Sequence, residues 1–309
     1  MKIAFFGTPE FALTVLQHLH TLNHEIVAVV CAVDKPQGRG NKLTPPPTKV
    51  FALEKGIKVL QYNKVRLEGV EDLKALNADI FVTAAFGQIL SQEILDIAPL
   101  GVVNVHGSLL PKYRGAAPVQ YALLNGEEKT GVTIMKTFAG IDDGDMILKK
   151  EIDILPEDNA ETLMDKIAHL GAKALEEALV QIENGTAVYT PQNHEEATFT
   201  RMLKKENAFI NFNISAKDVV NFVRAFNPNP VAKFVYNGEE HKVFKANVIE
   251  QSHNYKAGEV VSASIKEGLI IACQENLVKI EELSAPSSKK LSAKDFLNGR
   301  KIEIGTILN

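Results

Sequence analysis

Continuous apolar runs alternate with helix-like segments through the first 155 residues of the chain. Strands are predicted at KIAFFG (2–7) and GVVNVH (101–106), and a helix is predicted over 9–22, where apolar residues recur every three or four positions. Further strands are predicted at 25–33, 56–61, 78–86, 131–139 and 146–155. This alternation predicts a parallel α/β sheet, covered by helices on both faces, that binds its ligands beyond the carboxyl ends of the strands.

A long helix is predicted after the sheet, capped by Asp158 or Asn159 and ending at Gly185. Its buried stripe is expected at Leu163, Ile167, Leu170 and Ala174. The pattern then changes, because residues 190–207 are polar and have no sustained period, as in an interdomain linker. Short alternating runs from residue 208, with a helix at 215–226, predict a small antiparallel barrel. We therefore divide the chain into an α/β domain (1–189), a linker (190–207) and a C-terminal barrel (208–309).

The composition, with 45% hydrophobic and 23% charged residues, is that of an ordinary globular protein. No apolar run approaches the roughly 18 residues of a membrane span, and Gly7 and Pro9 interrupt the start too early for a signal peptide, so we expect a cytoplasmic protein. Residues 1–207 carry 21 Lys or Arg against 27 Asp or Glu, and residues 208–309 carry 13 against 11. Contact with nucleic acid is therefore expected only from local basic clusters.

Three polar residues lie at strand ends of the predicted sheet or in adjacent loops. Asn104 and His106 are two positions apart, so both side chains leave the same face of one strand, and Asp142 follows a later strand in GIDDGD. A histidine and an asparagine can donate hydrogen bonds to a carbonyl oxygen as it becomes an oxyanion, while a carboxylate orients the imidazole and relays protons. The set predicts attack of an amine on an acyl group. The alternative, in which His106 caps a strand and Asp142 makes a turn, explains each residue singly but not the three together.

Neither a covalent intermediate nor a metal site is indicated. Ser108 lies near His106 but lacks the G-x-S-x-G turn of a nucleophilic serine. Cys31 and Cys273 are far apart and show no CxxC spacing, which argues against a disulfide framework and a cysteine-based zinc site. Both cysteines are expected in the core, and no metal is expected.

The sequence around these polar residues resembles the folate-dependent formyltransferases, through NVHGSLLPKYRGAAP (104–118) and GIDDGD (140–145). Within that family the chain is similar to the members that act on methionylated initiator tRNA. The segments that carry this resemblance are FFGTPEFA (5–12), DKPQGRGNKLTPPPTKVFALEKGI (34–57), KTGVTIM (129–135) and RAFNPNP (224–230). The resemblance implies a Rossmann-like formyltransferase domain, an OB-like C-terminal β-barrel that binds tRNA, and 10-formyltetrahydrofolate as the formyl donor.

The resemblance also implies a role for each motif residue. Asn104 and His106 would hold and polarise the formyl oxygen, and Asp142 would keep the imidazole and an ordered water in place. The folate is expected to lie along Ser108, Leu109, Leu110 and Pro111. For each leucine, packing of the loop onto the core is an equal alternative.

Arg39 and Lys42, in the loop DKPQGRGNKL, are expected to meet the acceptor end of the initiator tRNA. A solvated charged loop is the ordinary interpretation of such a segment, and only the resemblance favours RNA. A second basic group near the C-terminus could follow an RNA backbone: Lys289, Lys290, Lys294, Arg300 and Lys301. The expected partners are thus methionylated initiator tRNA and folate, with no membrane, and we expect a monomer.

Three other functions are weighed against this one. A formyltransferase for a small amine, such as a nucleotide-linked amino sugar, would have less use for the long loop and the separate C-terminal domain. A dinucleotide-dependent oxidoreductase is disfavoured because FFGTPEFA lacks G-x-G-x-x-G. A non-catalytic RNA-binding module would leave Asn104, His106 and Asp142 unexplained.

Overall fold

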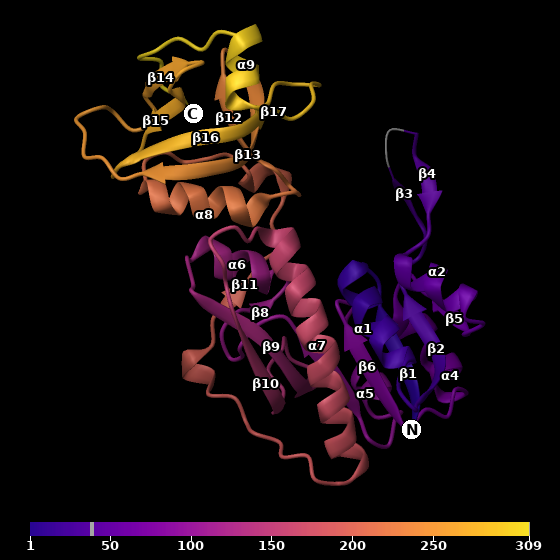
Figure 1. Cartoon of the computed structure of the whole chain (residues 1–309). Helices are drawn as coiled ribbons and strands as arrows, with labels where there is room; N and C mark the ends of the chain where they lie inside the picture. Colours follow the sequence, from indigo (N-terminus) through magenta and orange to yellow (C-terminus); the bar gives the residue numbers. More distant parts are fainter. Residues whose placement is uncertain (38–39, 309) are drawn as a thin grey trace. The chain divides into compact units, whose positions relative to one another are not determined.

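The structure is a computed structural model that describes residues 1–37 and 40–308, and the chain forms two compact units (Figure 1). Unit 1 comprises Met1–Pro118, Thr130–Ile152 and Met164–Thr200, and unit 2 comprises Val119–Lys129, Asp153–Leu163 and Arg201–Asn309. The predicted fold class is confirmed, because a mainly parallel sheet with helices is followed by an antiparallel sheet in the C-terminal part.

Unit 1 is built on a seven-stranded sheet in the order β10-β9-β7-β6-β1-β2-β5. Neighbours from β7 to β5 pair in parallel, whereas β9 runs antiparallel to β7, which the predicted all-parallel sheet did not include. The strands are β1 (Lys2–Gly7), β2 (Glu25–Cys31), β5 (Val59–Gln61), β6 (Ile80–Ala84), β7 (Val102–His106), β9 (Lys129–Lys136) and β10 (Met146–Asp153).

Helices cover both faces of this sheet because its central strands are apolar on both sides. Phe6 and Phe81 point into one cluster with residues of the short helices α3 to α5, whereas Gly7 lies close against Ala12 of α1. Helices α1 and α2 pack against each other, α1 contacts β1 and β6, and α2 contacts β2 and β5. The helices are α1 (Glu10–His20), α2 (Pro47–Glu54), α3 (Val65–Glu68), α4 (Val70–Lys74), α5 (Gln92–Leu95), α6 (Pro118–Leu124) and α7 (Ala160–Glu183).

The alternation of side chains along β7 determines which face of the sheet Asn104 and His106 occupy. Val102 belongs to the cluster under α3 to α5, and Val105 lies against Gly171 of α7, on the other face. Because side chains alternate along a strand, Asn104 and His106 share the face of Val102, opposite to α7.

The long helix predicted after the sheet is confirmed as α7. Asn159 caps it, because its Oδ1 accepts hydrogen bonds from the backbone N–H groups of Glu161 and Thr162 at 2.9 and 3.0 Å. Asp158, the other predicted cap, instead accepts from the backbone N–H of Leu155 at 2.9 Å. Of the predicted stripe, Leu163, Ile167 and Ala174 are buried and Leu170 is half-buried.

The charged segment at 34–43, predicted as an irregular loop, is in part a β-hairpin. Strands β3 (Lys35–Gln37) and β4 (Lys42–Thr44) pair antiparallel and extend away from the sheet of unit 1 (Figure 1). At its base, both carboxylate oxygens of Asp34 accept hydrogen bonds of 2.8 Å from Lys49 Nζ, and Gln61 Nε2 donates to Asp34 Oδ1 at 2.9 Å. These contacts lower the pKa of Asp34, with the hydrogen bond from Lys49 as the largest cause.

The polar segment predicted as a linker is not a free connection over its first half. Residues 190–200 belong to unit 1, where β11 (Phe199–Thr200) pairs in parallel with β8 (Arg114–Gly115). A short 3-10 helix, η1 (His194–Glu196), lies within this stretch, and η2 (Lys205–Asn207) lies in unit 2. We call residues 190–200 the strap.

Unit 2 contains an antiparallel sheet in the order β12-β13-β16-β15-β14, with β17 paired to β16. Helix α8 lies along β13, and α9 packs on β15 and β16 (Figure 1). Arg224 of α8 holds the segment 153–163, because its Nε donates to the carbonyl of Asp158 and its Nη2 to that of Leu155, both at 2.7 Å. The elements are α8 (Ala216–Phe226), β12 (Ala232–Tyr236), β13 (Glu239–Ile249), β14 (Val260–Ser264), β15 (Gly268–Ala272), β16 (Leu277–Ser284), β17 (Leu291–Ser292) and α9 (Ala293–Gly299).

Candidate active site

His106 and Asp142, predicted to act together, are neighbours in unit 1. His106 Nδ1 lies 3.6 Å from Asp142 Oδ2, and the imidazole is almost wholly buried. The other ring nitrogen, Nε2, donates a hydrogen bond of 2.9 Å to the carbonyl oxygen of Tyr113, since a carbonyl can only accept. The bond to Tyr113 fixes the tautomer, so that in the neutral ring the lone pair of Nδ1 faces the carboxylate.

A proton between Nδ1 and Oδ2 would turn this contact from repulsive to attractive. The pair can therefore take up a proton and hold it beside a reacting group. The Nε2 hydrogen is already committed to Tyr113, so donation from His106 to a substrate oxygen would come from protonated Nδ1.

Asn104 is oriented from the neighbouring strand. Thr83 of β6 lies opposite Asn104 in the register, and its hydroxyl donates to Asn104 Oδ1 at 2.9 Å. Within the described part of the chain, the Asn104 amide N–H groups have no hydrogen-bond partner. The half-buried side chain can therefore donate hydrogen bonds to a ligand at the end of β7. A carbonyl oxygen, such as that of a formyl group, would accept them.

The turn at 113–115 binds both His106 and Asp142. The backbone N–H of Gly115 donates to Asp142 Oδ2 at 2.8 Å, while the Tyr113 carbonyl binds His106. Tyr113 and Asp142 both have left-handed backbones, with φ of 62° and 46°, a conformation that costs on the order of 1 to 3 kcal/mol for residues other than glycine. Such a backbone persists only when its surroundings fix it, and here the strap does so.

The strap binds this turn through several hydrogen bonds. Thr198 Oγ1 accepts from the Tyr113 N–H at 2.8 Å, and Thr200 Oγ1 donates to the Arg114 carbonyl at 3.1 Å. Gln192 Oε1 accepts from Arg114 Nε and Nη2 at 3.0 and 2.7 Å, and its Nε2 donates to the carbonyls of Asp142 and Gly144 at 2.9 and 2.7 Å. These strap residues, like Thr83, were not predicted. Nothing in the sequence indicates that Gln192, in a polar run, is buried. Thr83 could have been identified, because it is a polar residue inside the apolar strand predicted at 78–86.

The residues predicted to lie along folate occupy two different environments. Ser108 is buried, and its hydroxyl donates to the Lys112 carbonyl at 2.7 Å within the same loop. Leu110 packs into a buried cluster with Met135 and Met146, which matches the alternative of a loop packed on the core. Leu109 and Pro111 are half-buried, so a ligand would meet these two side chains first.

Of the two predicted tRNA-binding residues, the structure describes only Lys42. Arg39 lies outside the described residues, together with Gly38. Lys42 is exposed on β4, in register with Gln37 of β3. The basic residues near the C-terminus are exposed in unit 2, and Lys290 is paired there with Glu282 at 2.7 Å.

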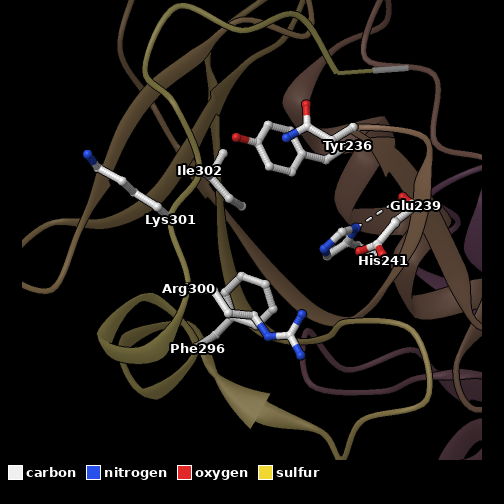
Figure 2. A pocket seen from close by; sticks show the side chains of 8 residues that line it. Tyr236, Glu239, His241, Phe296, Arg300, Lys301 and Ile302 are labelled. Atoms are coloured by element: carbon white, nitrogen blue, oxygen red, sulfur yellow. Dashed lines mark hydrogen bonds between the residues drawn. The ribbon is translucent and has the colours of Figure 1, made fainter.

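Unit 2 also contains a pocket of about 250 Å³ (Figure 2). His241 lies deep in it, donating from Nδ1 to the Glu239 carbonyl at 3.1 Å and stacking on Phe234 with ring centroids 5.3 Å apart. The residues that line the pocket are Tyr236, Asn237, Glu239, His241, Phe296, Arg300, Lys301 and Ile302.

Both cysteines are unpaired and buried, as predicted. Across residues 1–37 and 40–308, no cluster of three or more His, Cys, Asp or Glu is arranged to hold a metal ion. None of the helices in these residues has the length and apolarity needed to cross a membrane.

Known proteins match the chain over nearly its whole length. The family model described as "Formyl transferase" matches residues 1–179, and "Formyl transferase, C-terminal domain" matches residues 202–301. A methionyl-tRNA formyltransferase of Acetivibrio thermocellus is 47% identical over 100% of this chain and 99% of its own length. One of Clostridioides difficile is 43% identical over the full length of both chains.

Solved structures share the fold at lower identity. An N-formyltransferase of Helicobacter canadensis, solved with folinic acid and dTDP-3-aminofucose, has a TM-score of 0.68 at 21% identity and covers 91% of this chain and 98% of its own. The solved structure shows the shared fold alone, whereas the sequence matches also identify the family. The chain belongs to the formyltransferase family and groups there with the methionyl-tRNA formyltransferases.

Proposed function

We propose that the protein transfers the formyl group of 10-formyltetrahydrofolate to the α-amino group of methionyl-initiator tRNA, giving N-formylmethionyl-tRNA for translation initiation in the cytoplasm. The observation that carries the chemistry is the placement of His106 Nδ1 3.6 Å from Asp142 Oδ2, on the strand face that also holds Asn104, whose amide N–H groups have no partner among the described residues. The folate cosubstrate supplies a formyl carbon that an amine can attack, with an oxygen that gains negative charge as the attack proceeds.

Each residue of the site has a task in that reaction. Asn104, held by Thr83 through its Oδ1, donates from its amide to the formyl oxygen. Asp142 and His106 Nδ1 hold the proton that the attacking amine must lose, and the same pair holds the proton that the departing nitrogen requires. Leu109 and Pro111 offer half-buried apolar surface along which a flat ring system can lie.

The acceptor is inferred from the relatives and from the basic residues of the segment 34–43. The relatives named methionyl-tRNA formyltransferase are 40 to 47% identical over essentially the whole chain. The sugar N-formyltransferase of known structure is 21% identical, so an amino sugar is the less supported acceptor. Arg39 and Lys42, of the segment 34–43, would contact the acceptor end of the tRNA.

We assign formyl transfer and tRNA binding to different parts of the chain. Residues 1–189, together with the strap that belongs to unit 1, would carry formyl transfer, and residues 208–309 would bind tRNA. In unit 2 the exposed cations, among them Arg300 and Lys301 at the pocket, are suited to phosphate contacts. The affinity for tRNA should then fall with salt, and each lost phosphate contact should lower the log-log slope by roughly 0.7 to 0.9.

The test is a competition for the formyl group. Purified protein, 10-formyltetrahydrofolate, methionylated initiator tRNA and a nucleotide-linked amino sugar are incubated together, and both formylated products are counted. Preferred formylation of the tRNA supports the proposal, and preferred formylation of the sugar would leave the chemistry intact but reject the acceptor. Arg39→Ala should raise the KM for charged tRNA with little effect on that for folate, whereas Lys58→Ala, an exposed lysine beyond the hairpin, should not.

A further inference from the structure

The buried amide of Gln192 joins the turn at 113–115, which binds both His106 and Asp142, to the loop 142–144, which carries Asp142. Gln192 is 5% exposed, and both ends of its amide are fully used. Its oxygen accepts twice from the Arg114 guanidinium, and its nitrogen donates to the Asp142 and Gly144 carbonyls. A buried amide with every bond satisfied is expensive to disturb, because any movement leaves polar groups unpaired.

These bonds close a ring around Asp142. The ring runs from the Gln192 nitrogen to the backbone of Asp142, and from the Asp142 carboxylate to the Gly115 N–H. It returns through the adjacent Arg114 to the Gln192 oxygen. One side chain therefore fixes the backbone from which the carboxylate extends and, through Arg114, the turn that binds the carboxylate.

Asp142 needs such support because its φ of 46° is unfavourable for a residue with a Cβ. Gly144, the other carbonyl bound by Gln192, is so close to the Lys136 carbonyl that a side chain there would clash. The loop 142–144 is thus held in one tight conformation, and within it the direction of the Asp142 carboxylate depends on the carbonyl contacts to Gln192.

We propose that Gln192 is a positioning residue for formyl transfer, which sets the distance between Asp142 Oδ2 and His106 Nδ1. The inference rests on the proposed function. It places a determinant of the reaction in a polar segment beyond residues 1–179, the part of the chain that matches the N-terminal family model. The hydrogen bonds of Gln192 go to the Arg114 side chain and to the Asp142 and Gly144 carbonyls, so it acts through the backbone and through Arg114.

The test compares Gln192→Glu, Gln192→Met and Asn193→Ala in the full chain. Glu retains an acceptor for Arg114 but sets a carboxylate against the two carbonyls, and Met removes both sets of bonds at similar size. The matched control, Asn193, is exposed, and among the described residues its side chain bonds to the Glu195 N–H and the Glu196 carboxylate, both within the strap. Initial rates with 10-formyltetrahydrofolate and charged tRNA are measured from pH 5.5 to 9, with thermal unfolding as the check of folding.

A positioning role predicts that kcat falls at least tenfold in both Gln192 variants, while both KM values stay within twofold. The limbs of the pH–kcat profile should also shift, because the distance between His106 Nδ1 and Asp142 Oδ2 has changed. Asn193→Ala should behave as wild type. Folded variants with wild-type kcat and pH profile would overturn the inference and leave the proposed function standing. Failure of both variants to fold would assign Gln192 to stability alone, and a wild-type protein that formylates no tRNA would overturn the proposed function and this inference together.

Discussion

Thr83 donates a hydrogen bond of 2.9 Å to Asn104 Oδ1 across two parallel strands, so the amide oxygen is occupied and the amide N–H groups are left as donors. We expect Thr83→Val to lower kcat/KM for formyl transfer about tenfold, because the amide can then flip, and removal of a whole oxyanion donor costs about 10²- to 10³-fold. Thr83→Ser, which keeps the hydroxyl, should stay near wild type. Equal rates in the two variants would remove Thr83 from the reaction.

His106 and Asp142, the residues proposed to hold the transferred proton, give the largest expected effect. His106→Ala and Asp142→Ala should each reduce formyl transfer by about 10²- to 10⁴-fold, the range for loss of a general acid or base. Both variants should keep the melting temperature of the wild-type protein and should still bind charged tRNA in a filter assay. Asp165→Ala, which removes an exposed carboxylate on α7, is the matched control. Turnover at the wild-type rate in either variant would refute the assignment.

Asp34 makes the stability of the hairpin base dependent on pH. The pKa of its carboxyl is below the ordinary value of 3.8, chiefly because Lys49 donates to it. The stabilisation is therefore complete above about pH 3.8 and is lost as the pH falls from there through the lowered pKa of the folded state. Asp34→Asn should lower the melting temperature at pH 7, and the difference from wild type should shrink below pH 3.8 in melting curves taken across that range. A constant difference would contradict this linkage.

Arg224 is expected to stabilise unit 2 through its bonds to the Asp158 and Leu155 carbonyls. Arg224→Met should cost about 2 kcal/mol of unfolding free energy, since hydrogen bonds from charged groups contribute about 1.5 to 3 kcal/mol and this guanidinium is half-exposed. Urea unfolding followed by circular dichroism measures the loss. Lys217→Met, an exposed change on the same helix, should cost little.

The two thiols should be inert in the folded protein. Burial raises the pKa of Cys31 to about 11 and that of Cys273 to about 12, so at pH 8 about one Cys31 thiol in a thousand is ionised. A disulfide reagent such as DTNB should label neither cysteine in native protein and both in 6 M guanidinium. Rapid labelling of the native protein would show that one of them is accessible.

Local pattern was enough to predict the parallel strands and the polar pair. Strand β1 is a continuous apolar run, and the two-residue spacing of Asn104 and His106 placed both on one face because strand periodicity is local. The direction of β9 was not predictable in this way, because a run of apolar residues contains no information on which neighbour it pairs with or in which direction.

The support of the site depends on tertiary closure, which local pattern does not contain. Gln192 and Thr200 lie in a polar run without a period, and they are buried only because the strap returns to the turn at 113–115. The hairpin β3–β4 had a weak cue, since Gly38, Gly40 and Asn41 are residues that hairpin turns favour, but its strands are only three residues long. Leu110 could not be separated from Leu109 by sequence, since only the packing shows that one faces the core.

The strap also sets a limit on where this chain can be cut. Thr200, the last strap residue, binds the turn at 114–117, and Arg201 already belongs to unit 2. A gene fragment that ends at residue 179 or 189 would remove Gln192, Thr198 and Thr200 while keeping Asn104, His106 and Asp142. In a fusion that transplants this chemistry onto another acceptor-binding domain, the junction therefore belongs no earlier than after Thr200, so that the eleven strap residues are kept.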